Sequence, residues 1–184
     1  MEEIERRAET LLARLPEFIW EGERPPIPVE EIANSRFDLL VRDVSPAEMR
    51  TAPGCPPLGD GEAISGLLIP SLGEIWVNAD EASEWPARRR FTIAHELGHH
   101  VLHHTGAQTL FCRKATVEPE DTPAEVRPPL PPSEAEANAF AAALLMPADL
   151  IEEYYRETGG DFARMCAVFK SSGGAMGRRL HAVI

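Results

Sequence analysis

The sequence predicts an α+β domain, with its strands in the first half of the chain and helices in the second. One observation is a pair of apolar segments, residues 63–70 and 74–78, which flank a Ser-Leu-Gly turn and so predict a hairpin. Another is the recurrence of apolar residues at helical spacing through most of the chain after residue 86. With 184 residues, 43% of them hydrophobic, the chain can bury one core, so we expect a single domain over residues 1–184.

The N-terminal part is expected to hold two helices and a strand. Residues 2–15 place apolar side chains on one helical face and end at Pro16, which cannot continue a helix. Residues 29–34 are compatible with a short helix, and residues 37–44 with a strand. Residues 52–61 contain three prolines and three glycines, which predicts a loop.

The most informative motif is His-Glu-Leu-Gly-His, residues 95–99, inside the run RFTIAHELGHHVLHH. On a helix, His95 and His99 lie one turn apart on the same face, so both can direct a ring nitrogen at one Zn²⁺. Glu96 lies roughly 60° around the helix from His99. It would therefore stay off the metal but near its water, as the base of a metal-dependent peptidase does.

The surroundings of the motif favour a helix. Pro86 suits a first helical turn, and Leu97, Val101 and Leu102 form an apolar stripe that would be buried. Gly98 weakens a helix by about 1 kcal/mol, so its place between the two histidines suggests close approach by another backbone or by a substrate. The alternative is a histidine-rich surface helix.

A third metal ligand is needed, and the spacing excludes a third histidine six residues beyond His99, where the chain has Thr105. His103 is about 12 Å of helix rise from His95, too far to share one ion. A carboxylate on a second helix is the better candidate, and we assign Glu134. Its alternative role is that of a first-turn acid that favours the helix dipole.

The second helix is predicted from its own signals. Ser133 is expected to be its N-cap, with Glu136 completing a capping box, and Pro147 ends it. Glu134 and Asn138 are four residues apart and so share a face. The expected apolar face comprises Ala137, Phe140, Ala141, Leu144 and Leu145.

These motifs resemble the ImmA/IrrE family of metallopeptidases. The matching segments are EIWVN, RFTIAHELGHHVLH and EAEANAFAAALLMP, with a weaker similarity in FKSSGGAMGRRLHAVI. The resemblance runs from about Gly73 to the C-terminus, interrupted between Thr105 and Pro132. It implies a zincin-like fold, with a small antiparallel or mixed sheet packed on the His-Glu-x-x-His helix and a C-terminal helical bundle. It also implies metal ligation by His95, His99 and Glu134, with Glu96 as the base.

The resemblance further implies a regulatory protease that cleaves a partner protein, such as a helix-turn-helix DNA-binding repressor. In this fold class a strand of the hairpin can border the active-site cleft. A peptide substrate could then pair with its free edge. The alternative is that the hairpin strands are internal to the sheet.

Residues 105–132 form an insert with six prolines from Pro119 onwards, so we expect an irregular flap or a flexible bridge. Cys112 within it could cap the metal as a thiolate, or could be an ordinary cysteine. Residues 148–184 are expected to form C-terminal helices over 150–158, 162–169 and 175–183. The last two, with Arg178 and Arg179, could form a DNA-reading unit, but their apolar content favours a role in completing the core.

The net charge of −12 and the pI near 4.9 argue against direct, non-specific nucleic-acid binding. They are compatible with a basic protein partner, or simply with solubility. The charged N-terminus has no signal-peptide core, and no apolar run approaches 18 residues, so no membrane association is expected. The odd number of cysteines, three, suits the reducing cytoplasm.

The sequence thus predicts a metal-dependent endopeptidase. The residue that stabilises the oxyanion is left open among Tyr154, Tyr155 and the histidines of residues 100–104. Zn²⁺ suits a two-histidine, one-glutamate site, and Mn²⁺ or Fe²⁺ could also occupy it. The alternatives are a non-proteolytic, metal-dependent protein-binding or sensor module and a DNA-binding regulator. The sequence does not predict the oligomeric state.

Overall fold

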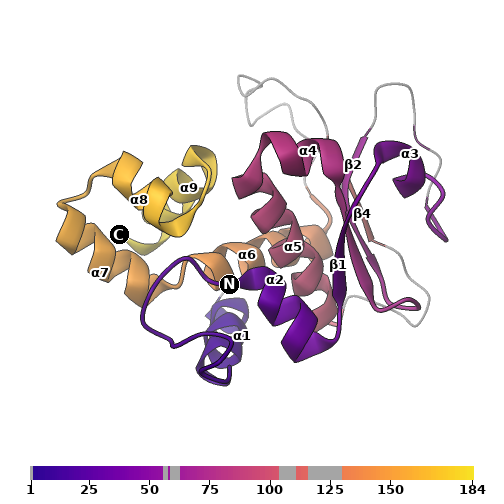
Figure 1. Ribbon diagram of the computed structural model, residues 1–184. Coiled ribbons are helices and arrows are strands. Elements are labelled where there is room, and N and C mark those ends of the chain that lie inside the picture. The colour runs from indigo at the N-terminus through magenta and orange to yellow at the C-terminus, as the bar shows by residue number, and fades with distance from the viewer. Residues whose placement is uncertain (1, 56–57, 59–62, 104–110, 116–129) are drawn as a thin grey trace.

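The computed structural model describes residues 2–55, 58, 63–103, 111–115 and 130–184, with the backbone alone for residues 111–115. It confirms a fold of mixed helix and strand. The strands gather in one sheet at the right of Figure 1, and helices lie on its left and extend to the C-terminus.

The described strands form one mixed sheet in the order β1-β3-β2-β4. β2 (Ala63–Ile69) and β3 (Glu74–Asn78) form the predicted antiparallel hairpin, while β1 (Leu40–Val44) runs parallel to β3. β4 (Phe111–Ala115) pairs antiparallel with β2 on its other side.

The expectation that a hairpin strand offers a free edge is therefore wrong, and the internal alternative holds. β2 and β3 each have a strand on both sides, because β4, a strand from within the insert, covers the edge of β2. The insert, residues 105–132, is expected to be irregular or extended, and the structure shows a strand, β4, within it. Residues 104–110 and 116–129, and the side chain of Cys112, lie outside the described residues, so the predicted flap is not tested.

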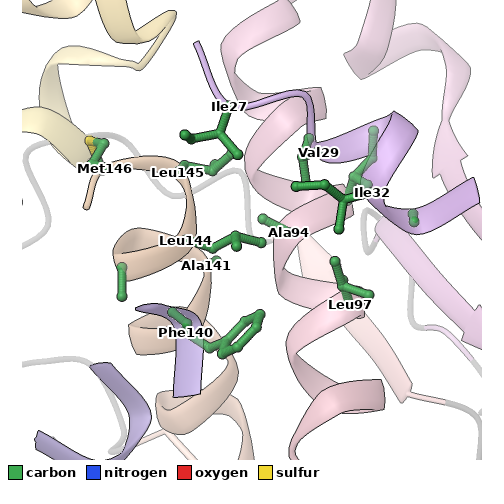
Figure 2. Close-up of a cluster of buried hydrophobic side chains, with 14 of the residues drawn as sticks. Ile27, Val29, Ile32, Ala94, Leu97, Phe140, Ala141, Leu144, Leu145 and Met146 are labelled. Atoms are coloured by element: carbon green, nitrogen blue, oxygen red, sulfur yellow. The ribbon is translucent and has the colours of Figure 1, made fainter. Parts of the chain in front are cut away.

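Helix α5 (Pro86–Val101), which carries the His-Glu-x-x-His motif, lies between the sheet and α6 (Pro132–Leu145). It begins at Pro86, as predicted, and its central turns are buried. Figure 2 shows apolar side chains where the two helices meet, with Ala94 of α5 facing Leu144 of α6. Phe140 of α6 lies against Gly98 of α5. Burial of these residues holds α5 and α6 side by side.

The sheet is buried on both faces. On the face towards α5, Leu68, Ile75 and Val77 join the main core. On the other face, a smaller cluster includes Leu67 and Trp76 and lies beneath α3 (Pro46–Met49). Two-sided burial explains why β2 and β3 are almost continuously apolar rather than alternating.

The N-terminal and C-terminal helices follow the predicted order. They are α1 (Glu2–Ala13), the short α2 (Val29–Glu31) that continues into the π-helical turn η1 (Ile32–Arg36), α7 (Ala148–Thr158), α8 (Phe162–Phe169) and α9 (Gly173–Val183). The short α4 (Ala79–Glu84), between β3 and α5, was not predicted. Gly159 ends α7 in the left-handed conformation that favours glycine. Among the described residues no helix is both long and apolar enough to cross a membrane.

The predicted capping box of α6 is wrong. The helix begins at Pro132 with Pro131 as its N-cap, so Ser133 lies inside the first turn and cannot cap it. A proline at the first helical position is already set to a helical φ, and the helix therefore begins two residues earlier than predicted. The apolar face was predicted correctly, since Ala137, Phe140, Ala141, Leu144 and Leu145 are all buried.

Arg179 of α9 ties the C-terminal helices to the rest of the fold. Its side chain is buried; its Nε donates to the Met146 carbonyl oxygen at 2.7 Å, and its guanidinium pairs with both carboxylate oxygens of Glu5 on α1. Arg178, next to it, is exposed. Arg179 thus stabilises the packing of the C-terminal helices against the rest of the chain. This agrees with the prediction that these helices complete the core.

We predict that Arg179→Ala lowers the free energy of unfolding by about 3 kcal/mol, because it breaks a charge-assisted pair and leaves the Met146 carbonyl without this donor. Arg178→Ala is the matched control and should stay within about 0.5 kcal/mol of the wild type. Urea unfolding followed by circular dichroism measures both. Equal effects from the two variants would contradict the structural role of Arg179.

Candidate metal centre

His95 and His99 occupy successive turns of α5 and turn their rings towards one point. Their Nε2 atoms are 3.1 Å apart and their ring centroids 4.7 Å apart. Both residues are completely buried. The structure therefore shows the pairing of ring nitrogens that the i, i+4 spacing predicts on a helix.

Glu134, in the first turn of α6, brings a carboxylate to this pair. Its Oε2 lies 3.2 Å from His95 Nε2 and its Oε1 lies 3.2 Å from His99 Nε2. One donor atom from each of the three residues lies within 4.8 Å of the others. The structure thus unites the three residues that the sequence singled out as ligands, although Glu134 is 35 positions from His99 along the chain.

The donors fit a divalent metal ion. Tetrahedral Zn²⁺ with bonds of about 2.0–2.2 Å places its ligand atoms about 3.3–3.6 Å apart, close to the 3.1 Å between the two Nε2 atoms and the 3.2 Å from each Nε2 to one of the two oxygens of Glu134. Two imidazoles and one carboxylate are the protein ligands of one type of catalytic zinc site, which keeps a further position open. The chemistry and spacing of the donor set therefore suit the ion.

The environment keeps Glu134 ionised. Burial raises the pKa of its carboxyl, but hydrogen bonds and charge interactions with His95 and His99 outweigh burial and hold that pKa well below its usual range. A carboxylate ligand must be deprotonated to bind a metal. The carboxyl is thus already in its metal-binding form at neutral pH.

Asn138 orients His95 from behind. Its Oδ1 lies 3.0 Å from His95 Nδ1, so the ring donates its Nδ1 proton there and leaves Nε2 free to face Glu134. The sequence showed that Asn138 shares a face with Glu134 but not that it contacts His95. The available signal in the sequence was that Glu134 and Asn138 are four residues apart on α6, as His95 and His99 are on α5.

Gly98 explains how α6 comes close enough. A Cβ built on it would lie 3.2 Å from the Ala137 carbonyl oxygen and 3.2 Å from Phe140 Cδ1. Contacts this tight leave little room for a side chain, so the glycine lets the α6 backbone lie directly against α5. Of the two causes expected for this glycine, a backbone or a substrate, the structure shows the backbone.

Glu96 faces the sheet rather than α6. It is completely buried, and a Cβ on Gly66 of β2 would be 3.0 Å from its Oε1. It does not belong to the group of three donors. Gly66 was not identified from the sequence, although a glycine inside a strand often marks close approach of another group.

The candidates for an oxyanion donor are not brought to the centre by any described contact. The Tyr154 ring packs on Phe169, with centroids 5.7 Å apart, and the His100 ring packs on Phe37 at 5.5 Å. Among the described residues, neither side chain hydrogen-bonds to the three donors, and His104 is not described.

Comparison with known proteins gives two findings. A sequence model of a peptidase family, described as the IrrE N-terminal-like domain, matches residues 62–181. Among solved structures, a Mycobacterium tuberculosis transcriptional regulator has a similar fold, with a TM-score of 0.56 and 16% sequence identity. The similarity covers 98% of this chain but only 47% of that protein.

No curated protein sequence matches the chain. The family match spans β2, β3, α5, α6 and the C-terminal helices, and so includes the motif and all three donors. It agrees with the resemblance drawn from the two motifs. The chain belongs to the peptidase family of the IrrE N-terminal-like domain.

Proposed function

We propose that this protein is a metal-dependent endopeptidase whose ion is held by His95, His99 and Glu134. The observation that carries the proposal is the convergence of their three donor atoms, from two helices, at separations that suit one ion. Membership of a peptidase family supports a hydrolytic rather than a purely structural role for such an ion. We propose that the domain is zincin-like and comprises residues 1–184 as one unit.

A bound Zn²⁺ would supply Lewis acidity towards a water molecule and a peptide carbonyl. His95 and His99 bind through Nε2, and Asn138 holds the His95 ring in the tautomer that permits this. Glu96 accepts a proton from the attacking water and passes it to the leaving amine. Glu96 is buried against β2 and lies outside the group of three donors, which suits a base that does not bind the ion.

For the substrate we propose a regulatory protein, specifically a DNA-binding repressor of the helix-turn-helix type. The family and the fold shared with a protein described as a transcriptional regulator support a regulatory setting. The acidic charge of the chain favours a basic partner over direct contact with nucleic acid. The burial of Arg179 also removes one of the two arginines that a DNA-reading use of α8 and α9 would need.

Replacing Glu96 with Gln is expected to lower kcat/KM by roughly 10²–10⁴-fold while metal content stays unchanged, because the amide cannot accept the proton. Zn²⁺-loaded wild type and variant are incubated with a proteome-derived peptide library, and new termini are counted by mass spectrometry. Full cleavage by the variant would refute the role of Glu96. A wild type that binds metal but cuts no peptide, with Zn²⁺ or with Mn²⁺, would instead support the alternative of a metal-dependent sensor module.

Replacing Glu134 with Ala should weaken Zn²⁺ binding more than about 100-fold, beyond the 10–100-fold typical of losing a residue that only orients a ligand. Glu136→Ala is the matched control, since Glu136 is exposed on the same helix and should leave the affinity unchanged. Competition with a chelating dye measures both affinities. A Glu134→Ala protein that binds Zn²⁺ like the control would remove Glu134 from the site.

Replacing Asn138 with Ala is expected to weaken Zn²⁺ binding about 10–100-fold, because the His95 ring loses the acceptor that holds it. Asn138→Asp keeps an acceptor at the same place and should retain wild-type affinity or exceed it. The same dye competition distinguishes them. Loss of affinity in both variants to the same extent would mean that Asn138 acts by packing and not as an acceptor.

A further inference from the structure

Strand β2 meets the metal-binding helix at a residue that has no side chain. A Cβ built on Gly66 would lie 2.3 Å from Thr92 Cγ2 and 3.0 Å from Glu96 Oε1. The first distance is far inside van der Waals contact, and both α5 residues are buried. The backbone of β2 itself therefore forms the wall against which the Glu96 carboxylate rests.

β2 cannot easily move away from this contact. Gly66 is in register with Val77 of β3 on one side and with Arg113 of β4 on the other. A shift of the strand away from α5 would disturb hydrogen-bonded ladders on both sides. An added side chain at Gly66 must therefore be accommodated by the helix side of the interface.

An irregularity just before Gly66 fastens β2 to the helices. The β2–β4 register shifts between Ile64 and Gly66, and Ser65, the residue between them, is buried. Ser65 Oγ donates to Glu81 Oε1 of α4 at 3.1 Å and accepts from Arg88 of α5 at 3.1 Å. These bonds hold β2 against the same helix that carries Glu96.

Thr92 and Glu96 would respond differently to an added methyl group. Thr92 is β-branched and buried, so its Cγ2 has few alternative positions on a helix. Glu96 Oε1 is the end of a longer side chain and can be displaced by rotation. In Gly66→Ala the 2.3 Å contact forces Thr92 or the helix to shift, and once Cγ2 is removed the carboxylate of Glu96 is the neighbour that the methyl would move.

We infer that Gly66 is a positioning residue for Glu96. Because Gly66 has no side chain, the Glu96 carboxylate can lie directly against β2. Gly66 thereby determines the position of this carboxylate relative to His95 and His99. The catalytic consequence rests on the proposed peptidase function, while the positional consequence stands on the packing alone. The two can therefore be tested separately.

The test compares Gly66→Ala, Thr92→Ser and the double variant. Thr92→Ser removes Cγ2, the atom that the new methyl would strike, and leaves Glu96 Oε1 as the close neighbour. Gly177→Ala is the control for a glycine replacement, because a Cβ there meets nothing within 4 Å. The measurements are urea unfolding of the metal-free proteins, Zn²⁺ affinity by dye competition, and kcat and KM on one library peptide that the wild type cleaves.

We expect Gly66→Ala to unfold at lower urea concentration than the wild type, and the double variant to return to the midpoint and Zn²⁺ affinity of Thr92→Ser. The double variant should nevertheless keep a kcat roughly 3–10-fold below that of Thr92→Ser, with KM changed by less than about twofold, because a small misplacement of a catalytic group lowers the rate of the chemical step. Gly177→Ala should match the wild type in kcat. A double variant with the kcat of Thr92→Ser would overturn the inference.

Crystal structures of metal-free Thr92→Ser and of the double variant give a readout that needs no activity. The inference expects the Glu96 carboxylate to shift by at least a few tenths of an ångström between them, with β2 unmoved. An unmoved carboxylate would refute the inference whatever the kinetics. If the wild type cleaves no peptide but the carboxylate moves as expected, the peptidase proposal fails and the positional inference stands.

Discussion

The close contact between α5 and α6 is the constraint on which the centre depends. Two of the three donors come from one helix and need only its pitch, but the third must arrive from a helix 35 positions further along the chain. The third donor is held in place by apolar packing between the helices, with Ala94, Phe140 and Leu144 completely buried where α5 and α6 meet. Gly98 allows the α6 backbone to lie directly against α5. The polar centre is thus held by an apolar, closely packed interface, which fixes the positions of the donor atoms.

The two faces of α5 carry residues with different proposed roles. One face turns His95 and His99 towards Glu134, and the other turns Glu96 towards β2. Buried polar groups must find partners, and here His95 Nδ1 finds one in Asn138 Oδ1 while its Nε2 lies beside the Glu134 carboxylate. The same arrangement keeps the carboxyl of Glu134 ionised. The helix therefore separates the residues proposed to hold a metal from the residue proposed to move a proton.

The remaining elements support this centre from a distance. The mixed sheet is buried on both faces and holds β2 rigidly beside α5, while Ser65 and Arg88 join strand to helix. At the other end of the molecule, Arg179 links α9 to α1 and to the end of α6. The C-terminal helices thus fix the far end of the helix whose first turn carries Glu134.

Features set by neighbours along the chain could be predicted from the sequence: the helix with paired histidines, the β2–β3 hairpin, the apolar face of α6, and the ends of α7 and α8. Glu134 could be selected as a candidate because it lies on a predicted helix, although the expected capping by Ser133 was wrong once Pro132 began the helix. Only the tertiary structure decided the sheet order, the strand within the insert, the contact of Asn138 with His95, and the closeness of Gly66 to Glu96. The physical reason is the distance along the sequence over which each interaction acts. Helical pitch, turns and apolar periodicity act within a few residues, whereas these contacts join segments whose approach depends on how the whole core packs.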